Sequence, residues 1–371
     1  MTEVHTTGRP SSSLSPSWPP SQSCTQPDGT KNYDSDHATN IWFLCISLAL
    51  GLTGTVGNLM VIGAVLVHKP LRRLHHAFIV NLAVADLCVS ALIQFATVEA
   101  ILRKGAYFRD RPALCNFFGF LCTTSCTCSL WSITAISVNR YVCICHNSAY
   151  HRIYTPGYKV AAMLAGLWLG CFFMDLPALL GDWCGHGYDA KVMFCTFNYS
   201  ASFSYTLFLV SVGVGFPVVI VSYCYVRILL FVRASRRTLR RLSEGANELV
   251  SLGQKKRGIR RRDMALLRTV VTLWIVFLVM WAPYTVYVVF DTQRTWDRTL
   301  YVLVVNLCHA NSSINCVIYA ATNPTFRRGY VALIRCLLCR KAIVVADRHP
   351  QSRNVSRNDA RDARPVSYST S

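Results

Sequence analysis

The chain has 371 residues, of which 52% are hydrophobic and only 15% are charged, and its mean hydropathy is +0.32. Ordinary soluble domains have about 25% charged residues, so this composition argues against a soluble globular protein and favours lipid as the surroundings. The formal net charge of +20 raises the question of nucleic-acid binding, but the basic residues lie between apolar runs and in the tail, so we expect no nucleic-acid partner.

Seven apolar runs, each long enough to cross a bilayer as a helix, follow one another along the chain. They span residues 41–67, 77–102, 113–136, 160–180, 203–232, 269–290 and 300–321. Lipid cannot satisfy exposed backbone N–H and C=O groups, so runs of this length cross only as helices. The sequence therefore predicts an all-α integral membrane protein, with a seven-helix bundle and without strands of consequence.

The predicted organisation is a disordered tail (1–38), the helix bundle (39–323), a short amphipathic eighth helix (324–340) and a second disordered tail (341–371). Basic residues concentrate in the connections after the first, third and fifth runs, although the connection after the second run is also basic. By the positive-inside rule, the first three connections are cytoplasmic. We therefore expect an extracellular amino terminus and a cytoplasmic carboxyl tail.

Most of the 17 cysteines lie inside the apolar runs, where a thiol is usually a small buried hydrophobe rather than a metal ligand. No zinc-type spacing of Cys with His is visible along the chain. Cys115 begins the third run and Cys195 precedes the fifth, so both face the oxidising side, where a disulfide can persist.

Polar side chains inside the runs mark a candidate functional site, because ionisable groups at bilayer depth are costly. Asp86 lies in the middle of the second run. Asn311, Asn315 and Tyr319 recur at every fourth position and form one polar stripe along the seventh helix, and Ser129 lies on a similar edge of the third. Two interpretations follow: a switch or cation site, or a hydrogen-bond network that serves only packing.

Charged residues also stand at the inner ends of two predicted helices. Arg140 lies where the third helix meets the cytoplasm, and Asp263 precedes the sixth on the same side. A guanidinium and a carboxylate so placed can form a breakable ion pair between the helices. The alternative is that Arg140 only extends its side chain to the lipid headgroups.

Two prolines interrupt the predicted helices, Pro217 in the fifth and Pro283 in the sixth. Each removes a backbone hydrogen bond, so we expect a bend there. Trp281, two residues before Pro283, is placed to report ligand occupancy to this pivot, although a helical Trp is often only part of the core.

In this order, the residues resemble the class A (rhodopsin-like) G-protein-coupled receptor family over roughly residues 41–339. The matching motifs are Gly57-Asn58, Leu82 to Asp86, Cys115, Asn139-Arg140-Tyr141, Trp168, Pro217, Tyr225, Trp281-Ala282-Pro283, Asn315 to Tyr319, and Phe326-Arg327. The resemblance implies a multi-pass plasma-membrane receptor for an extracellular small molecule, with heterotrimeric G proteins and arrestin as partners.

The resemblance also assigns roles to residues. It implies a disulfide between Cys115 and Cys195, and G-protein coupling through Arg140, Tyr225 and Asp263. It implies an allosteric sodium ion, and no other cofactor, held near Asp86. The residues of this sodium and switch site are Asp86, Ser129, Trp281, Asn311, Asn315 and Tyr319.

Within the family, three segments are similar to the melatonin-receptor branch: Asn139-Arg140-Tyr141, Ile144-Cys145-His146 and Cys195-Thr196-Phe197. That branch couples to inhibitory G proteins. The positions that match its ligand-binding Asn, His and Gln hold Ala178, Gly213 and Tyr199 here, so the ligand stays open, with an orphan receptor for a lipid or peptide as the alternative.

The ligand pocket is expected between the outer halves of the helices. Cys122 stands where amine receptors have an Asp, which argues against a biogenic amine, and the seventh helix has no Lys that could bind retinal. Asp175 is expected either to meet a polar ligand group or to make a structural hydrogen bond. The expected pocket residues are Cys122, Asp175, Phe197, Trp281, Tyr284 and His309.

Modification sites are predicted at both faces. Cys336 and Cys339 lie near the end of the predicted amphipathic helix and are palmitoylation candidates. Asn198 begins an Asn-Tyr-Ser acceptor sequon in an outer loop. The rival classes, a membrane transporter or channel and a membrane enzyme, lack the paired halves or the nucleophile and base that each needs.

Overall fold

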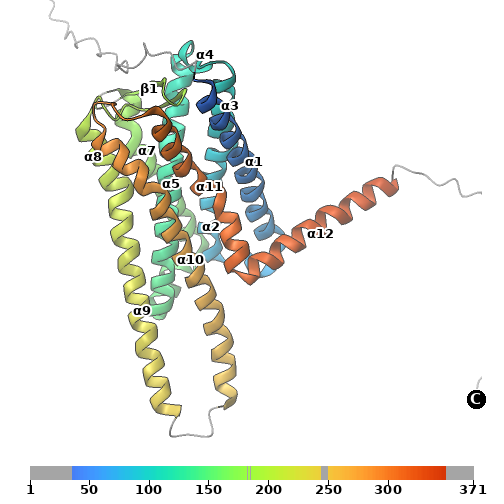
Figure 1. Ribbon diagram of the computed structural model, residues 1–371. Coiled ribbons are helices and arrows are strands. Elements are labelled where there is room, and N and C mark those ends of the chain that lie inside the picture. Colours follow the sequence, from blue (N-terminus) through green and yellow to red (C-terminus); the bar gives the residue numbers. More distant parts are fainter. Residues whose placement is uncertain (1–35, 182, 184, 244–249, 348–371) are drawn as a thin grey trace, which may run out of the picture.

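The computed structural model describes residues 36–181, 183, 185–243 and 250–347. The two predicted tails therefore lie almost wholly outside the described residues. In the described part, seven helices are long and apolar enough to cross a membrane, which confirms the predicted fold class (Figure 1). They are His37–Val67, Leu74–Leu102, Pro112–Cys145, Gly157–Leu180, Phe203–Ser235, Val271–Phe290 and Arg298–Thr322.

The first half of the chain forms α1 (His37–Val67), α2 (Ala77–Leu87), α3 (Gln94–Leu102), α4 (Ala106–Arg109), α5 (Pro112–Cys145), α6 (Asn147–Tyr154) and α7 (Gly157–Leu180). The second half forms β1 (His186–Asp189), β2 (Phe194–Phe197), α8 (Phe203–Val210), α9 (Phe216–Ser243), α10 (Val250–Phe290), α11 (Arg298–Thr322) and α12 (Pro324–Asp347). Two short 3-10 turns, Lys69–Leu71 and Leu74–His76, connect α1 to α2.

Two of the spans are not regular α-helices along their whole length. A π-helical segment, η3 (Cys88–Ile93), joins α2 to α3, and a second, η4 (Ser211–Gly215), joins α8 to α9. Such wide turns are frequent at functional sites. The first begins two residues after Asp86, and the second ends two residues before Pro217. Both irregular turns therefore adjoin residues that the sequence singled out.

Hydrogen bonds and close backbone contacts hold the bundle together inside. Asn81 of α2 donates from Nδ2 to Ser132 Oγ of α5 at 2.7 Å and accepts from Trp168 Nε1 of α7 at 2.9 Å. Gly57 of α1 lies so close to α11 that a Cβ there would be 2.2 Å from Cys316 Sγ. A larger residue at Gly57 would therefore require Cys316 or the packing of α1 on α11 to shift.

The outward faces of the helices are apolar. Ile41, Val219 and Phe290 are 62%, 66% and 70% exposed, and they belong to a large set of exposed hydrophobic side chains distributed over the spans. Soluble proteins rarely expose apolar surface so extensively. The faces therefore suit contact with lipid acyl chains, and the chain is a multi-pass membrane protein.

The two strands form an antiparallel hairpin in which His186 pairs with Phe197 and Asp189 with Phe194. The hairpin lies outside the seven spans, over one end of the bundle near α4 (Figure 1). We call this the hairpin end. The opposite end, where α11 turns into α12, is the α12 end. The prediction of no consequential strands holds for the spans, and the hairpin is a small exception that lies outside them.

Helix α12 begins at Pro324, as predicted, and extends to Asp347, beyond the expected end at residue 340. Its ribbon runs away from the bundle (Figure 1). Phe326 is fully buried and stacks on Tyr319 with ring centroids 4.9 Å apart, while its edge meets His76 at 5.8 Å. One aromatic side chain thus joins α12 to α11 and to the start of α2.

Candidate functional site

Asp86 is fully buried between three helices. Its Oδ1 accepts a hydrogen bond from Ser129 Oγ of α5 at 2.7 Å, and its Oδ2 accepts one from Asn315 Nδ2 of α11 at 2.6 Å. Short hydrogen bonds to a carboxylate are stronger than neutral ones. The structure therefore brings together three residues that the sequence placed on three separate helices.

The other two members of the predicted polar stripe on α11, Asn311 and Tyr319, do not make the hydrogen bond to Asp86 that Asn315 makes. Asn311 is 3% exposed, and its Oδ1 has no hydrogen-bond partner among the described residues. The hydroxyl of Tyr319 is also buried without a partner in that part of the chain, and its ring packs on α12. Buried polar atoms without partners are costly, so these two oxygens are free to accept an ion, a water or a hydrogen bond in another conformation.

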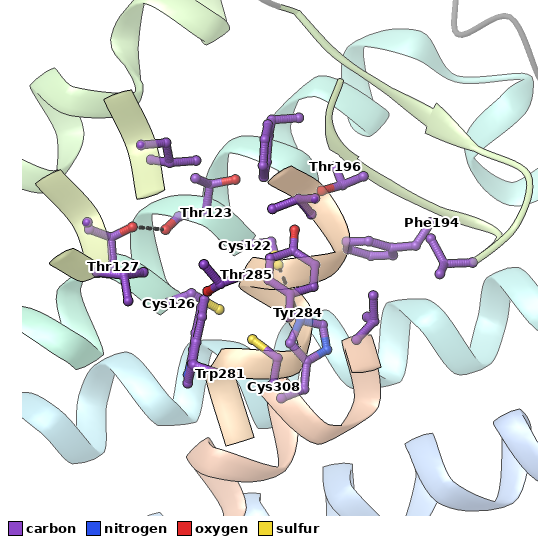
Figure 2. Close-up of a pocket in the computed structure, with 18 of the residues that line it drawn as sticks. Cys122, Thr123, Cys126, Thr127, Phe194, Thr196, Trp281, Tyr284, Thr285 and Cys308 are labelled. Atoms are coloured by element: carbon purple, nitrogen blue, oxygen red, sulfur yellow. Dashed lines mark hydrogen bonds between the residues drawn. The ribbon is translucent and has the colours of Figure 1, made fainter. Parts of the chain in front are cut away.

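A cavity opens between α5, η4, α10 and α11 under the hairpin (Figure 2). Its volume is about 90 Å³, and since a water needs about 10–15 Å³ on this measure, several waters or a small ligand fit. Five of the six predicted pocket residues line it: Cys122, Phe197, Trp281, Tyr284 and His309.

The cavity wall is apolar and aromatic, with a few hydroxyl, amide, thiol and imidazole groups. No Asp, Glu, Lys or Arg of the described residues lines it. Thr123, Thr196 and Thr285 lie around it on α5, β2 and α10 (Figure 2). Burying a charged ligand without a countercharge is expensive. The cavity therefore suits a neutral ligand with one or two hydrogen-bonding groups.

Asp175, the sixth predicted pocket residue, does not line the cavity. It is 1% exposed, and its Oδ1 accepts a hydrogen bond from the Tyr205 hydroxyl at 2.8 Å and lies 3.5 Å from His186 Nε2. Thr124 Oγ1 donates to its Oδ2 at 3.4 Å. Of the two predicted roles for Asp175, the structural hydrogen bond is the one the structure shows, and it joins α7 to α8 and β1.

A disulfide ties the hairpin to the helices. Cys115, in the first turn of α5, bonds to Cys195 of β2, with Cα atoms 5.2 Å apart. This pairing is the one that the family resemblance implied. Because Phe194, Thr196 and Phe197 flank or follow Cys195 and line the cavity, the bond fixes the cavity roof against α5.

Ion pairs and hydrogen bonds that the sequence did not reveal attach the hairpin to the helices at a second place. Arg294 donates to Asp189 of β1 at 2.6 Å, and Lys191 donates from Nζ to the Arg294 carbonyl at 2.9 Å. Arg298 of α11 donates to the Lys191 carbonyl and to Asp36, both at 2.9 Å. Asp189, Lys191 and Arg294 are each at most 6% exposed. These contacts connect the hairpin to the α10–α11 loop and to the start of α1.

A column of aromatic rings leads from the cavity floor toward the α12 end. Trp281 lines the cavity and stacks on Phe277 with centroids 5.6 Å apart, and Phe277 stacks on Trp274 at 5.7 Å. Tyr284 meets Trp281 edge-on at 6.0 Å on the cavity side. A change in the position of Trp281 therefore requires a response from Phe277.

Comparison with known proteins identifies the architecture. Residues 57–319 match the model of the 7 transmembrane receptor (rhodopsin family). The chain belongs to this family. It is a receptor family and not an enzyme family, so the protein is a class A G-protein-coupled receptor, and the transporter, channel and hydrolase alternatives no longer apply.

The receptor is similar to several melatonin receptors over most of its length. It is 31% identical to melatonin receptor type 1B of Mus musculus over 307 residues, covering 79% of this chain and 78% of the relative. It is 30% identical to the type 1B receptor of Homo sapiens, covering 76% and 74%. Squid rhodopsin has the same fold, with a TM-score of 0.69 at 22% identity, covering 81% of the receptor and 87% of the rhodopsin chain.

The three positions that depart from the melatonin-receptor pattern lie in different surroundings. Gly213 lines the cavity, while Ala178 is buried in α7 outside it. Tyr199 is fully buried, and the guanidinium of Arg294 lies 5.0 Å above its ring. Burial raises the pKa of the Tyr199 phenol, so its hydroxyl stays neutral. Only Gly213 therefore changes the cavity wall itself.

At the α12 end, Arg140 of α5 is 4% exposed, so it lies within the bundle and not among lipid headgroups. Tyr225 of α9 places its hydroxyl 3.1 Å from Ser137 Oγ of α5, one turn before Arg140. The side chain of Asp263 lies outside the described residues, and the ion pair with Arg140 stays a prediction.

The predicted modification sites differ in accessibility. Asn198 is 1% exposed, and its Oδ1 accepts hydrogen bonds from Ser200 Oγ at 2.9 Å and from the Ala201 amide at 3.2 Å. A glycosylated side chain must reach solvent, so this burial counts against Asn198 as an acceptor, and its glycosylation stays a prediction. Cys336 is partly exposed on α12 and remains a palmitoylation candidate, while the side chain of Cys339 is outside the described residues.

Proposed function

We propose that the receptor binds a small, neutral, aromatic extracellular ligand in the cavity beneath the hairpin and activates inhibitory heterotrimeric G proteins at its α12 end. In this proposal, it lies in the plasma membrane with the hairpin end outside. The observation that supports the ligand class is the uncharged, aromatic cavity wall around Trp281 and Tyr284. A charged amine or carboxylate would have no counter-ion there.

Melatonin, for which the relatives are named, is the first candidate ligand. It is a neutral indole with an amide, and this chemistry matches the cavity. Gly213 removes one side chain that the melatonin-receptor pattern places in the wall, so we expect weaker melatonin binding than in those relatives. A different neutral aromatic compound, or a lipid or peptide, is the alternative occupant.

The signalling path follows from the contacts below the cavity. Ligand binding moves Trp281, which moves Phe277 and Trp274 in the stacked column. The hydrogen-bonded cluster of Asp86, Ser129 and Asn315, with a sodium ion in the inactive state, then rearranges. Helix α10 shifts at the α12 end, and Arg140 becomes available to the G protein. Arrestin is expected to recognise the same end.

The test is a ligand screen in transfected cells that reads both cyclic AMP and calcium, with melatonin included. We expect a neutral aromatic ligand to lower forskolin-stimulated cyclic AMP and to be inactive in cells that express Arg140→Ala. Arg335→Ala, on the exposed face of α12, is the matched control and should keep the response. A response only to charged amines, or a full response from Arg140→Ala, would contradict the proposal.

A further inference from the structure

Three side chains from two helices bring soft metal ligands together in the cavity wall. Cys122 and Cys126 of α5 and His309 of α11 place their sulfur and nitrogen atoms within 4.8 Å of one another. Cys122 Sγ lies 3.6 Å from His309 Nε2. The two cysteines are one helical turn apart on the same face, whereas His309 is 187 positions from Cys122. This distance along the chain explains why no zinc-type spacing is visible in the sequence.

The separations suit a zinc ion. Zinc binds sulfur at about 2.3 Å and imidazole nitrogen at about 2.0–2.1 Å, so in a tetrahedron the sulfur and nitrogen atoms lie about 3.6 Å apart and two sulfurs about 3.8 Å apart. The Cys122–His309 distance already has this value, and Cys126 Sγ lies within 4.8 Å of both atoms. We propose that Cys122, Cys126 and His309 form a Zn²⁺ site with its fourth coordination position open to the cavity.

The donor set selects the metal. Two thiolates and an imidazole favour Zn²⁺ or another soft ion, whereas Mg²⁺ and Ca²⁺ need several oxygen ligands. No carboxylate of the described residues lines the cavity, so hard cations are disfavoured there. The structure has both cysteines as free thiols, as a metal site requires, rather than as a disulfide. Binding releases thiol protons, so zinc affinity falls as the pH is lowered.

The open position faces the place where a ligand would sit. Figure 2 shows Cys122 and Cys126 beside the same space as Trp281 and Tyr284. With both thiols deprotonated, bound Zn²⁺ would leave the wall without a net charge, and at its open position it could accept a donor atom from the ligand. The site rests on the geometry of the cavity and not on the proposed ligand, so the two can be tested separately.

The experiment uses the full-length receptor, purified in detergent, treated with a chelator and kept under a phosphine reductant. Co²⁺ alone is then added as a spectroscopic substitute for Zn²⁺. We expect one equivalent to produce a thiolate-to-cobalt charge-transfer band and the intense visible bands of tetrahedral cobalt, both abolished by equimolar Zn²⁺. Loss of one of the three ligands in Cys126→Ala or His309→Gln should weaken Zn²⁺ binding roughly a hundred-fold.

Cys308→Ala is the matched control, because Cys308 is a buried cysteine that lines the same cavity but is not part of the cluster. It should keep the cobalt spectrum. Thermal melting of each variant shows whether it is folded, and Cys126→Ser replaces Cys126→Ala if the latter is not. Absence of the charge-transfer band in the folded wild-type receptor, its persistence in the Cys126 and His309 variants, or its loss in Cys308→Ala would overturn the proposal. None of these measurements needs an agonist.

Discussion

The buried carboxylate of Asp86 gives the most direct test of the polar cluster. Placing a carboxylate in the interior costs several kcal/mol. The two hydrogen bonds from Ser129 and Asn315 offset about 1.5–3 kcal/mol each, or about 3–6 kcal/mol together. None of the ion pairs among the described residues includes Asp86. In the proposed function a sodium ion supplies this countercharge, so Asp86→Asn should abolish its binding.

The size of the effect follows from mass action. A ligand present at one hundred times its dissociation constant stabilises the folded state by about 2.7 kcal/mol. The melting temperature of the purified wild-type receptor should therefore rise when sodium chloride replaces choline chloride at equal ionic strength. Asp86→Asn keeps the size of the side chain but removes its charge, so its melting temperature should be the same in both salts. Sodium should also lower agonist affinity in the wild type and leave it unchanged in the variant.

Asp175→Asn is the matched control for this experiment. Asp175 is also a carboxylate that is buried inside the spans. It lies near the hairpin end, where Tyr205 and His186 are its partners. Its substitution should leave the sodium response intact, whatever it does to stability. An unchanged sodium shift in Asp86→Asn, or an equal loss in Asp175→Asn, would refute the assignment.

Three further substitutions, one of them with a control, test the disulfide of the hairpin, helix α12 and the cavity. Cys115→Ala opens a loop that spans 80 positions, so the free energy of unfolding should fall by at most about 4.5 kcal/mol, measured by thermal melting. Phe326→Ala should lower it by about 3–5 kcal/mol, whereas Val331→Ala, 47% exposed on the same helix, should change it by under about 0.5 kcal/mol. Gly213→His should raise melatonin affinity about five-fold in competition binding, because a Cβ there has its nearest neighbour 3.8 Å away and one added hydrogen bond contributes about 1 kcal/mol. Unchanged affinity in Gly213→His would mean that melatonin does not reach this wall.

Much of the fold could be predicted because the responsible signals are local. Each span is a continuous apolar run, and its length alone indicates a membrane-crossing helix. Asp86 and Asn315 were found by the same reasoning, since a polar residue stands out inside such a run. Their contact was then expected because the interior of the bundle is the one place where both avoid lipid.

The contacts that the sequence did not reveal join residues far apart along the chain. Arg294 of the α10–α11 loop and Asp189 of β1 are separated by 105 positions, and nothing in the composition around either residue indicates the pairing. Asn198 fits an acceptor sequon, but only the fold shows that its side chain is buried. The site of Cys122 and His309 depends on how α5 and α11 are rotated about their axes. Sequence periodicity gives the polar face of one helix, but not which residues of two faces meet.

The contacts between helices offer a route by which the cavity and the cluster of Asp86, Ser129 and Asn315 would influence each other in the proposed mechanism. Trp281 lines the cavity and also packs against the hydrophobic core below it, on the side of the α12 end, which contains Phe277 and Trp274. A packed interior cannot deform continuously, so a ligand that displaces one ring of this column selects between discrete arrangements of α10. Asp86 and Asn315 hold α2 to α11, and α11 packs along α10. If a cation fixes the first pair in one position of α10 and a ligand that shifts Trp281 favours another, as proposed, the two sites are thermodynamically opposed.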